Sequence, residues 1–132
     1  MNKMERELRR LFSESDIIYK AMYSGRTMIG MIDHDVRVKI EFATTRVSGK
    51  YDAIKATVLN RTEGIVDTTL FKISDMIGLK NGHELHIWDD GNKADWFVVS
   101  PTASDYDKMS DVLHDYMAMF ADESLDYHMH TQ

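Results

Sequence analysis

Strict alternation of apolar and polar residues is the feature that most constrains the fold of this chain. It is clearest in residues 36–42, where four apolar residues alternate with Arg37, Lys39 and Glu41. Successive side chains of a strand point to opposite faces, so this pattern predicts a half-buried β-strand. Residues 53–59 repeat the alternation. Together with the apolar run at residues 27–32, these segments predict an antiparallel meander.

Helical spacing brackets the strands. Residues 2–12 carry apolar side chains at intervals of three and four, which predicts a helix. A second helix is predicted to begin near Ser104, where Asp107 completes a capping box, and to run to about Phe120. Its apolar stripe consists of Tyr106, Met109, Leu113, Tyr116 and Phe120.

The segment between the strands and this last helix allows two interpretations. The preferred one is a strand at residues 64–67 followed by a helix that Asp67 or Thr68 caps and that ends at Gly78. In the alternative, residues 65–73 form a strand and only residues 74–78 are helical.

Both tryptophans lie in a predicted hairpin. Residues 84–88 and 94–99 are strand-like runs around the turn at residues 89–92. Paired strands pack large rings against each other, so Ile87, Phe97 and Val99 are expected to be buried and the turn exposed. Trp88 and Trp96 remain candidates for contact with a partner.

These elements predict an α+β fold. An antiparallel sheet of five to six strands packs with N-terminal and C-terminal helices and a short middle helix. The length of 132 residues fits one domain, and we expect it to span residues 1–122, with residues 123–132 as a flexible C-terminal tail.

Composition excludes several classes of protein. The chain has no cysteine, which rules out a disulfide framework, a cysteine zinc site and a cysteine nucleophile. The charged N-terminus lacks the apolar core of a signal peptide, and no window is long and apolar enough for a membrane span. We therefore expect a cytoplasmic protein without a membrane partner.

Charge is distributed unequally along the chain. Residues 1–61 hold twelve Lys and Arg against eight Asp and Glu, whereas residues 62–132 hold four against fourteen. Asp107, Asp111 and Asp115 follow one another at helical spacing and form one acidic face. That face is either solvated surface or a docking site for a basic protein partner.

The basic residues of the first half suggest a weaker alternative. Arg37, Lys39, Lys55 and Arg61, with Tyr51 near them, could share the outer face of the sheet. Phosphate contacts dominate nucleic-acid affinity, so a chain with a net charge of −6 is a poor candidate for such binding.

No motif for catalysis or metal binding accompanies the histidines. Asp33, His34 and Asp35 are expected at a hairpin tip, and His83 and His86 are too far out of phase on a strand to hold one metal ion. The chain also lacks a phosphate loop, a nucleophile elbow and a zinc-protease signature. The sequence predicts no catalytic residue, no metal site and no cofactor.

Several short runs of the sequence resemble a known group of proteins. The runs RTEGIVD, HIW with WFVV, and PTASDY are similar to parts of small uncharacterised accessory proteins of conjugative elements and plasmids in gut Firmicutes. The resemblance covers residues 25–120 and implies a dispensable gene on a mobile element. Because that family has no established activity, no site residue is carried over.

Three hypotheses follow. The first is a non-enzymatic, protein-binding accessory protein of a mobile element, acting for instance as an inhibitor of a host defence nuclease through its acidic C-terminal half. The second is a dimeric secretion or effector chaperone, because the order of elements looks like that of class I type III secretion chaperones. The third is an enzyme whose groups would come from Asp33, His34, Asp67, His86 and the aspartates of the predicted hairpin, converging in a pocket.

Overall fold

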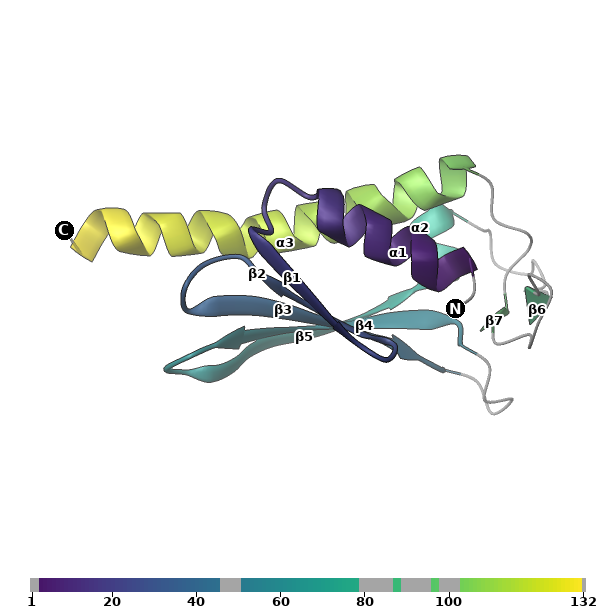
Figure 1. Cartoon of the computed structure of the whole chain (residues 1–132), viewed down its shortest axis with the longest axis horizontal. Helices are drawn as coiled ribbons and strands as arrows, with labels where there is room; N and C mark the ends of the chain where they lie inside the picture. The colour runs from purple at the N-terminus through teal and green to yellow at the C-terminus, as the bar shows by residue number, and fades with distance from the viewer. Residues whose placement is uncertain (1–2, 46–50, 79–86, 89–95, 98–102, 132) are drawn as a thin grey trace.

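The chain folds as one helical layer on an antiparallel sheet, which confirms the α+β prediction (Figure 1). The structure is a computed structural model that describes residues 3–45, 51–78, 87–88, 96–97 and 103–131. The description covers the backbone alone at residues 3–4, 87–88, 96–97 and 122–131. The elements, in chain order, are α1 (Lys3–Glu14), β1 (Lys20–Ser24), β2 (Thr27–Met31), β3 (Val36–Ala43), β4 (Ala53–Asn60), β5 (Gly64–Lys72), α2 (Ile73–Ile77), β6 (Ile87–Trp88), β7 (Trp96–Phe97) and α3 (Ala103–Thr131).

The main sheet is a meander in which each strand pairs with the next one in sequence. Its strand order is β1-β2-β3-β4-β5, and all pairs are antiparallel. A separate two-stranded sheet joins β6 and β7, with Trp88 opposite Trp96. The predicted hairpin is therefore present, while its turn and the burial of its side chains lie outside the described residues.

Local turn chemistry closes the meander. Gly25 has φ 59° at the first position of the two-residue β1–β2 turn, where a positive φ favours glycine. At the β4–β5 turn, the side-chain oxygen of Asn60 accepts hydrogen bonds from the backbone N–H groups of Thr62 and Glu63. The predicted hairpin tip at residues 33–35 connects β2 to β3, and the Asp33 carboxylate accepts the backbone N–H of Asp35.

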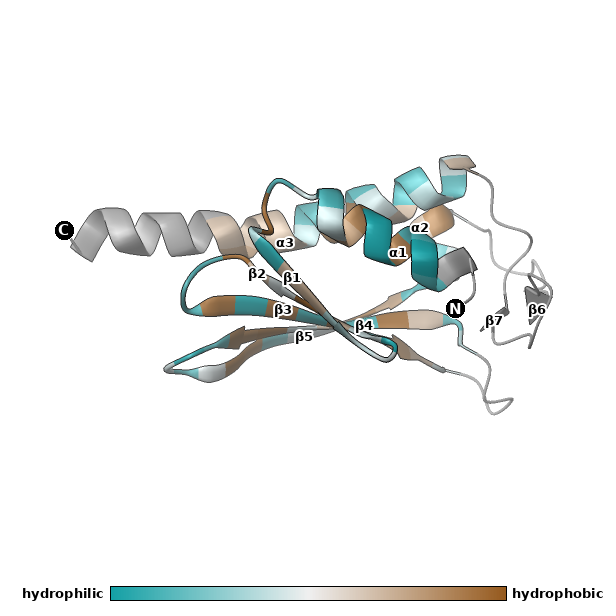
Figure 2. Cartoon of the chain, in the orientation of Figure 1, coloured by the Kyte–Doolittle hydropathy of each residue, from teal (hydrophilic) through white to brown (hydrophobic). Residues whose placement is uncertain are grey.

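One face of the sheet forms the core with the helices. Its fully enclosed residues come from alternating positions of β3 and β4, with Met28 added from β2. Figure 2 shows apolar and polar residues alternating along β3. The core residues on the sheet are Met28, Val38, Ile40, Ile54, Ala56 and Val58, and those on the helices are Leu8, Phe12, Ile73, Met76, Ile77, Tyr106, Met109, Leu113, Tyr116 and Met117. The predicted stripe of α3 is thus confirmed as the face that packs on the sheet.

Gly30 sets how closely α1 approaches the sheet. A Cβ atom at this position would lie 2.6 Å from Cζ of Phe12 and 2.8 Å from Cδ1 of Ile18. The missing side chain leaves the space in which the Phe12 ring sits, so glycine is needed here for packing and not for a turn.

The preferred interpretation of the middle segment is wrong. β5 continues to Lys72 and α2 spans only Ile73–Ile77, so Asp67 and Thr68 lie in a strand and cap no helix. Full-length pairing with β4 outweighs the local capping signal, because Thr68 and Thr69 are β-branched and fit a pleated sheet. The predicted helix end is confirmed, since Gly78 takes the left-handed conformation with φ 78°.

α3 is longer than the sequence predicts. Its backbone stays helical to Thr131, beyond the expected end near Phe120. Residues 121–131 lose the apolar stripe but contain neither glycine nor proline, so nothing in them terminates a helix. The expected flexibility of residues 123–132 stays a prediction.

Candidate functional site

An open groove of about 350 Å³ lies where the end of α1, the middle of α3 and the sheet meet. α1 and α3 cover the same face of the sheet (Figure 1). Residues of both helices line the groove. Its lining consists of Leu8, Leu11, Phe12, Glu14, Ser15, Asp16, Met28, Ile40, Ser110, Asp111, Leu113, His114 and Met117. We call this the α1–α3 groove.

The floor of the groove is apolar. It is made of side chains that also belong to the core, among them Phe12 on α1, Met28 on β2 and Met117 on α3. These side chains are rigidly packed from below, so the floor is preformed.

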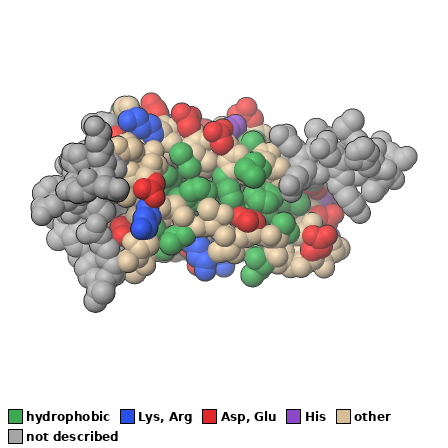
Figure 3. All heavy atoms as spheres, turned by 180° about the vertical axis from the view of Figure 1, so that it is seen from behind, with side chains coloured by type: hydrophobic (Ala, Val, Ile, Leu, Met, Phe, Trp, Pro, Cys, Tyr) green, Lys and Arg blue, Asp and Glu red, His purple; other side chains and the backbone are tan. Residues whose placement is uncertain are grey.

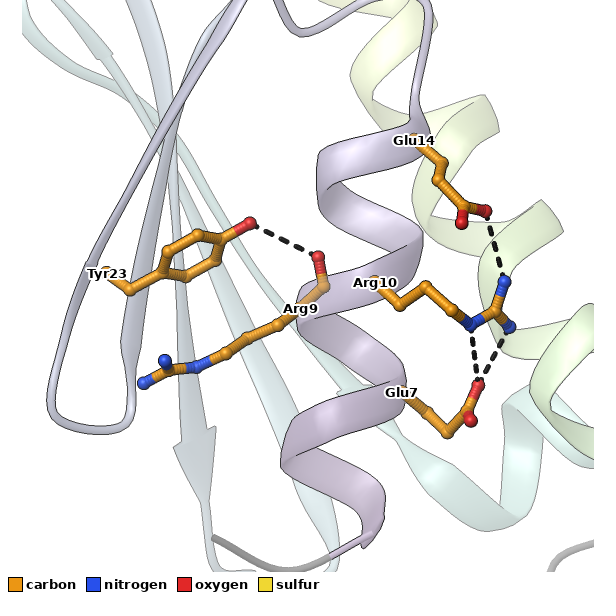
Figure 4. A network of polar contacts seen from close by, with 5 residues as sticks. All are labelled: Glu7, Arg9, Arg10, Glu14 and Tyr23. Carbon is orange, nitrogen blue, oxygen red and sulfur yellow. Dashed lines mark hydrogen bonds and ion pairs between the residues drawn. The ribbon is translucent and has the colours of Figure 1, made fainter.

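The rim of the groove is acidic. Glu14 and Asp16 lie on the α1 side of the groove. Asp111 lies on α3, and His114 lies about one helical turn after it. Arg10 neutralises Glu14 through an ion pair of 3.0 Å (Figure 4). Within the part of the chain that the structure describes, Asp16 and Asp111 have no ion-pair partner. Two uncompensated carboxylates therefore flank an apolar floor.

A second opening of about 260 Å³ continues the same line toward the start of both helices. Glu7, Arg10, Ala103, Tyr106 and Asp107 line it. Arg10 also contacts the carboxylate of Glu7, at 2.7 Å, so this opening is closer to charge balance than the α1–α3 groove. The favourable site for a cation is consequently the groove between Asp16 and Asp111.

The predicted acidic face of α3 is divided between these openings. Asp107, Asp111 and Asp115 are all exposed. Exposure fits both a solvated surface and a docking site for a basic partner, so that choice stays a prediction. Asp111 lines the α1–α3 groove, Asp107 lines the second opening and Asp115 lines neither. Glu14 and Asp16 are not among the residues that the sequence predicts for a site, because they lie in a polar run after the apolar spacing of residues 2–12 ends; α1 continues to Glu14.

Contacts to the β1–β2 hairpin hold α1 in place. The Tyr23 hydroxyl contacts both Ser13 and the backbone oxygen of Arg9, the latter at 3.2 Å (Figure 4). The Arg9 guanidinium lies 4.8 Å from the centre of the Tyr23 ring and donates a hydrogen bond of 2.5 Å to the backbone oxygen of Gly25. The hairpin thereby fixes one wall of the groove.

α3 is held at the opposite edge of the sheet. The hydroxyl groups of Tyr116 and Thr69 both donate to the same carboxylate oxygen of Asp67, the latter at 2.8 Å. These donors, first the Tyr116 hydroxyl, lower the pKa of Asp67, while burial and the Asp67 carboxylate raise the pKa of Tyr116 to about 12. The Tyr116 ring also packs edge-on against Phe71 and Phe120. Asp67 thus fastens the second wall of the groove.

The outer face of the sheet carries basic side chains, and some of them are the ones that the sequence predicts. Arg37, Lys39 and Lys55 occupy its alternating positions, and the strand pairing adds Lys20 and Lys72, which the sequence reasoning did not include. Tyr51 does not belong to this face, because its ring packs against Phe42 and under the Arg26 guanidinium. No described side chain of the outer face is aromatic, so it offers no platform on which a base could stack.

The groups required for the enzyme hypothesis do not line the α1–α3 groove. Asp33 and His34 lie at the β2–β3 turn, and Asp67 faces α3 as a hydrogen-bond acceptor. His83 and His86 lie outside the described residues, as do the side chains of Trp88 and Trp96. Among the described residues, no group of three or more histidines and carboxylates is placed to hold a metal ion.

Two further findings bear on the class of protein. No helix in the described ranges is long and apolar enough to cross a membrane. No protein-family model, curated protein or solved structure matches the chain.

Proposed function

We propose that this protein is a non-enzymatic binding protein whose α1–α3 groove takes a basic, partly apolar segment of a partner protein. The observation that carries the proposal is the apolar floor between Asp16 and Asp111, two carboxylates without an ion-pair partner among the described residues. An apolar side chain of the partner would fill the groove, and a Lys or Arg beside it would meet the rim.

The two contributions have different roles. Burial of apolar surface supplies affinity, at about 25 cal/mol per Å² removed from water. Exposed ion pairs are worth about 0–1 kcal/mol each, so the rim selects a basic partner and speeds its approach more than it tightens binding. The acidic side chains along the helical side of the molecule extend this attraction beyond the groove (Figure 3).

Binding fits the groove better than nucleophilic catalysis does. Ser110 and His114 lie four residues apart on α3 and both line the groove, as does Asp111. A serine nucleophile needs a hydrogen bond of about 2.6–3.2 Å to its base. Within the described residues no side-chain hydrogen bond joins Ser110 to His114, so these side chains are not arranged as a catalytic relay.

The test uses two short synthetic peptides, one in which leucine alternates with lysine and one in which it alternates with glutamate. Fluorescence anisotropy should show that only the lysine peptide binds and that added salt weakens it. The double variant Asp16→Asn and Asp111→Asn should weaken binding by about fivefold, as expected for the loss of two exposed ion pairs. The control Asp115→Asn removes an exposed carboxylate outside the groove and should weaken binding by less than about twofold, because it acts only through long-range attraction.

A blocking variant tests the floor separately from the rim. Ser110 is partly exposed on the α3 wall, and Ser110→Trp would add a large side chain to the groove while keeping both carboxylates. Loss of peptide binding in this variant supports the proposal. Equal binding of both peptides, or unchanged binding in the Ser110→Trp protein, contradicts it.

The biological setting that we propose is the one that the resemblance implies, an accessory protein of a mobile element. In that setting a basic segment at the nucleic-acid groove of a host defence nuclease is a partner of the right charge. The acidic helix would then take the place of nucleic acid.

The observed order of elements favours one second candidate. A helix, strands, a short helix, a two-stranded hairpin and a final helix follow each other as in the layout of class I type III secretion chaperones. Such a chaperone would hold its client as an extended, unfolded segment. Binding of denatured but not of native client would favour the chaperone, and the reverse would favour the inhibitor.

A further inference from the structure

β5 is an edge strand that exposes apolar side chains. It spans nine residues, Gly64–Lys72, and among the described strands it pairs with β4 alone. The exposed fractions of Ile65, Val66 and Leu70 are 67%, 43% and 49%. An open edge offers a row of unpaired N–H and C=O groups, and exposed apolar residues beside it favour pairing with another strand.

The other edge of the sheet is shorter and is covered by contacts to α1, although it also exposes one apolar side chain, Met22, at 40%. β1 spans five residues, begins with Lys20 and is held against α1 by Tyr23. In β5, the two charged residues do not block an approach, because Asp67 is bonded to Tyr116 on the helix side and Lys72 is the last residue. The β-bulge between β4 and β5 lies at Val66, so the strand is regular from Asp67 onward.

We infer that β5 pairs antiparallel with β5 of a second copy of this chain, with Thr68 at the two-fold axis. This register places Val66 opposite Leu70 of the second copy and Leu70 opposite Val66, so the exposed apolar side chains cover one another. In antiparallel pairing, directly opposite residues point to the same face of the joined sheet. The helices of both copies therefore lie on one face of it. Shifting the axis to Asp67 would set two aspartates directly opposite each other.

Charge at the strand ends selects the antiparallel arrangement. Glu63 precedes β5 and Lys72 closes it, so the proposed register brings Lys72 of the second copy beside Glu63. Parallel pairing would bring the two copies of Lys72 together instead. This complementarity favours a second copy as the partner, because β5 and the residue before it supply both members of each contacting pair, Val66 with Leu70 and Glu63 with Lys72.

α3 continues the apolar surface beside the edge. Val112 lines a small groove of about 160 Å³ with Leu70 and Phe71, which places it on the β5 side of the helix. Met119 is two helical turns later on the same face and is 59% exposed. β1 lies at the front of Figure 1. Figure 3 shows the molecule from the opposite side, and hydrophobic side chains lie across the middle of that opposite side. The second copy would cover these side chains as well as β5.

The inference is independent of the α1–α3 groove, and two double variants of β5 test it. In the variant Val66→Lys with Leu70→Lys, lysines face lysines across the two-fold axis, so sedimentation equilibrium should give the 15.3 kDa mass of one chain. In the variant Val66→Lys with Leu70→Glu, each lysine faces a glutamate, and a mass of twice one chain should return. Met22→Lys, on an exposed position of the β1 edge, is the control that stays dimeric.

Each result is decisive. A monomeric wild-type chain at sub-millimolar concentration overturns the inference, as does a dimer that survives in the lysine–lysine variant. A lysine–glutamate variant that stays monomeric overturns the register.

Hydrogen exchange of the wild-type chain needs no variant. On passing from low to high micromolar protein, the amides of β5 should exchange at least tenfold more slowly, whereas those of β1 should not change. Equal rates in β5 at both concentrations contradict the inference.

Discussion

The two faces of the sheet differ more than any other pair of surfaces in this molecule. On the covered face, Ile54, Ala56 and Val58 are fully buried under the helices. On the outer face of the same strand, Lys55 is exposed, and β3 adds Arg37 and Lys39. On the helical layer above the covered face, Asp107, Asp111 and Asp115 are exposed on α3. Figure 3 shows acidic side chains along this side of the molecule.

This difference shows how a charge imbalance along the sequence becomes a difference between two sides of the fold. The first half of the chain contributes most of the sheet, and its cations point away from the helices. The acidic second half contributes α3. Partners of opposite charge would therefore approach from opposite sides, basic ones toward α1 and α3 and acidic ones toward the open sheet.

The largest expected effect comes from breaking the covered face. Ile54→Ala removes a side chain with no exposed surface, and we expect the free energy of unfolding to fall by about 3 kcal/mol. Lys55→Ala on the outer face of the same strand should change it by less than about 0.5 kcal/mol. Urea denaturation of both variants measures the contrast, and similar losses would mean that the two faces are not distinct.

A smaller effect is expected where α1 approaches the sheet. Gly30→Ala places a Cβ atom 2.6 Å from Cζ of Phe12, which should lower the free energy of unfolding by about 2 kcal/mol. Phe12→Leu removes the clashing ring atoms. The double variant should therefore lose less free energy of unfolding than the sum of the losses in the two single variants. Additive losses in the denaturation curves would contradict the proposed contact.

The link between α3 and β5 should cost less to remove. Tyr116→Phe leaves the ring in place but removes its donor to Asp67, and we expect a loss of about 1 kcal/mol. The pKa of Asp67 is lowered in the folded chain, so its stabilising contribution is present above the unfolded pKa of about 3.9 and disappears as the pH falls below it. Unfolding curves at neutral and acidic pH should converge for wild type and Tyr116→Phe at the acidic end.

The alkaline side gives the opposite sign. The folded pKa of Tyr116 is about 12, above the value of about 10 for an exposed tyrosine. Stability from this group is complete below pH ~10 and is lost as the pH rises toward 12. Tyr116→Phe should abolish this part of the alkaline loss, and a variant that retains it would show that another group is responsible.

Much of the fold could be predicted from the sequence because its strongest signals are periodic. The alternation in β3 and β4 and the stripe of α3 both indicate which side chains face the core. Most of these side chains are buried, while Val36, Phe42 and Phe120 are partly buried and pack against the core. The middle segment was predicted wrongly because Asp67 resembles a helix cap locally, whereas its partners, Thr69 and Tyr116, come from the strand and a distant helix. Such long-range hydrogen bonds have no signature in a short window of sequence.

The candidate site was predictable only in part. Asp111 belongs to a visible acidic stripe, but the groove that gives it a role depends on where the end of α1 lies against α3. Asp16 is 95 residues away in sequence and carries no pattern that connects it with Asp111. Only the packing of the two helices on one face of the sheet brings these carboxylates to the same groove.

The central claim, that the α1–α3 groove binds a basic and apolar segment, is tested most directly at its methionines. Met28 and Met117 line the groove, whereas Met22 and Met119 are exposed elsewhere. In a chain labelled with ¹³C at the methionine methyl groups, titration with the leucine–lysine peptide should shift the NMR signals of Met28 and Met117 and leave those of Met22 and Met119 in place. Shifts confined to Met22 or Met119, or no shift at any methionine, would contradict the claim.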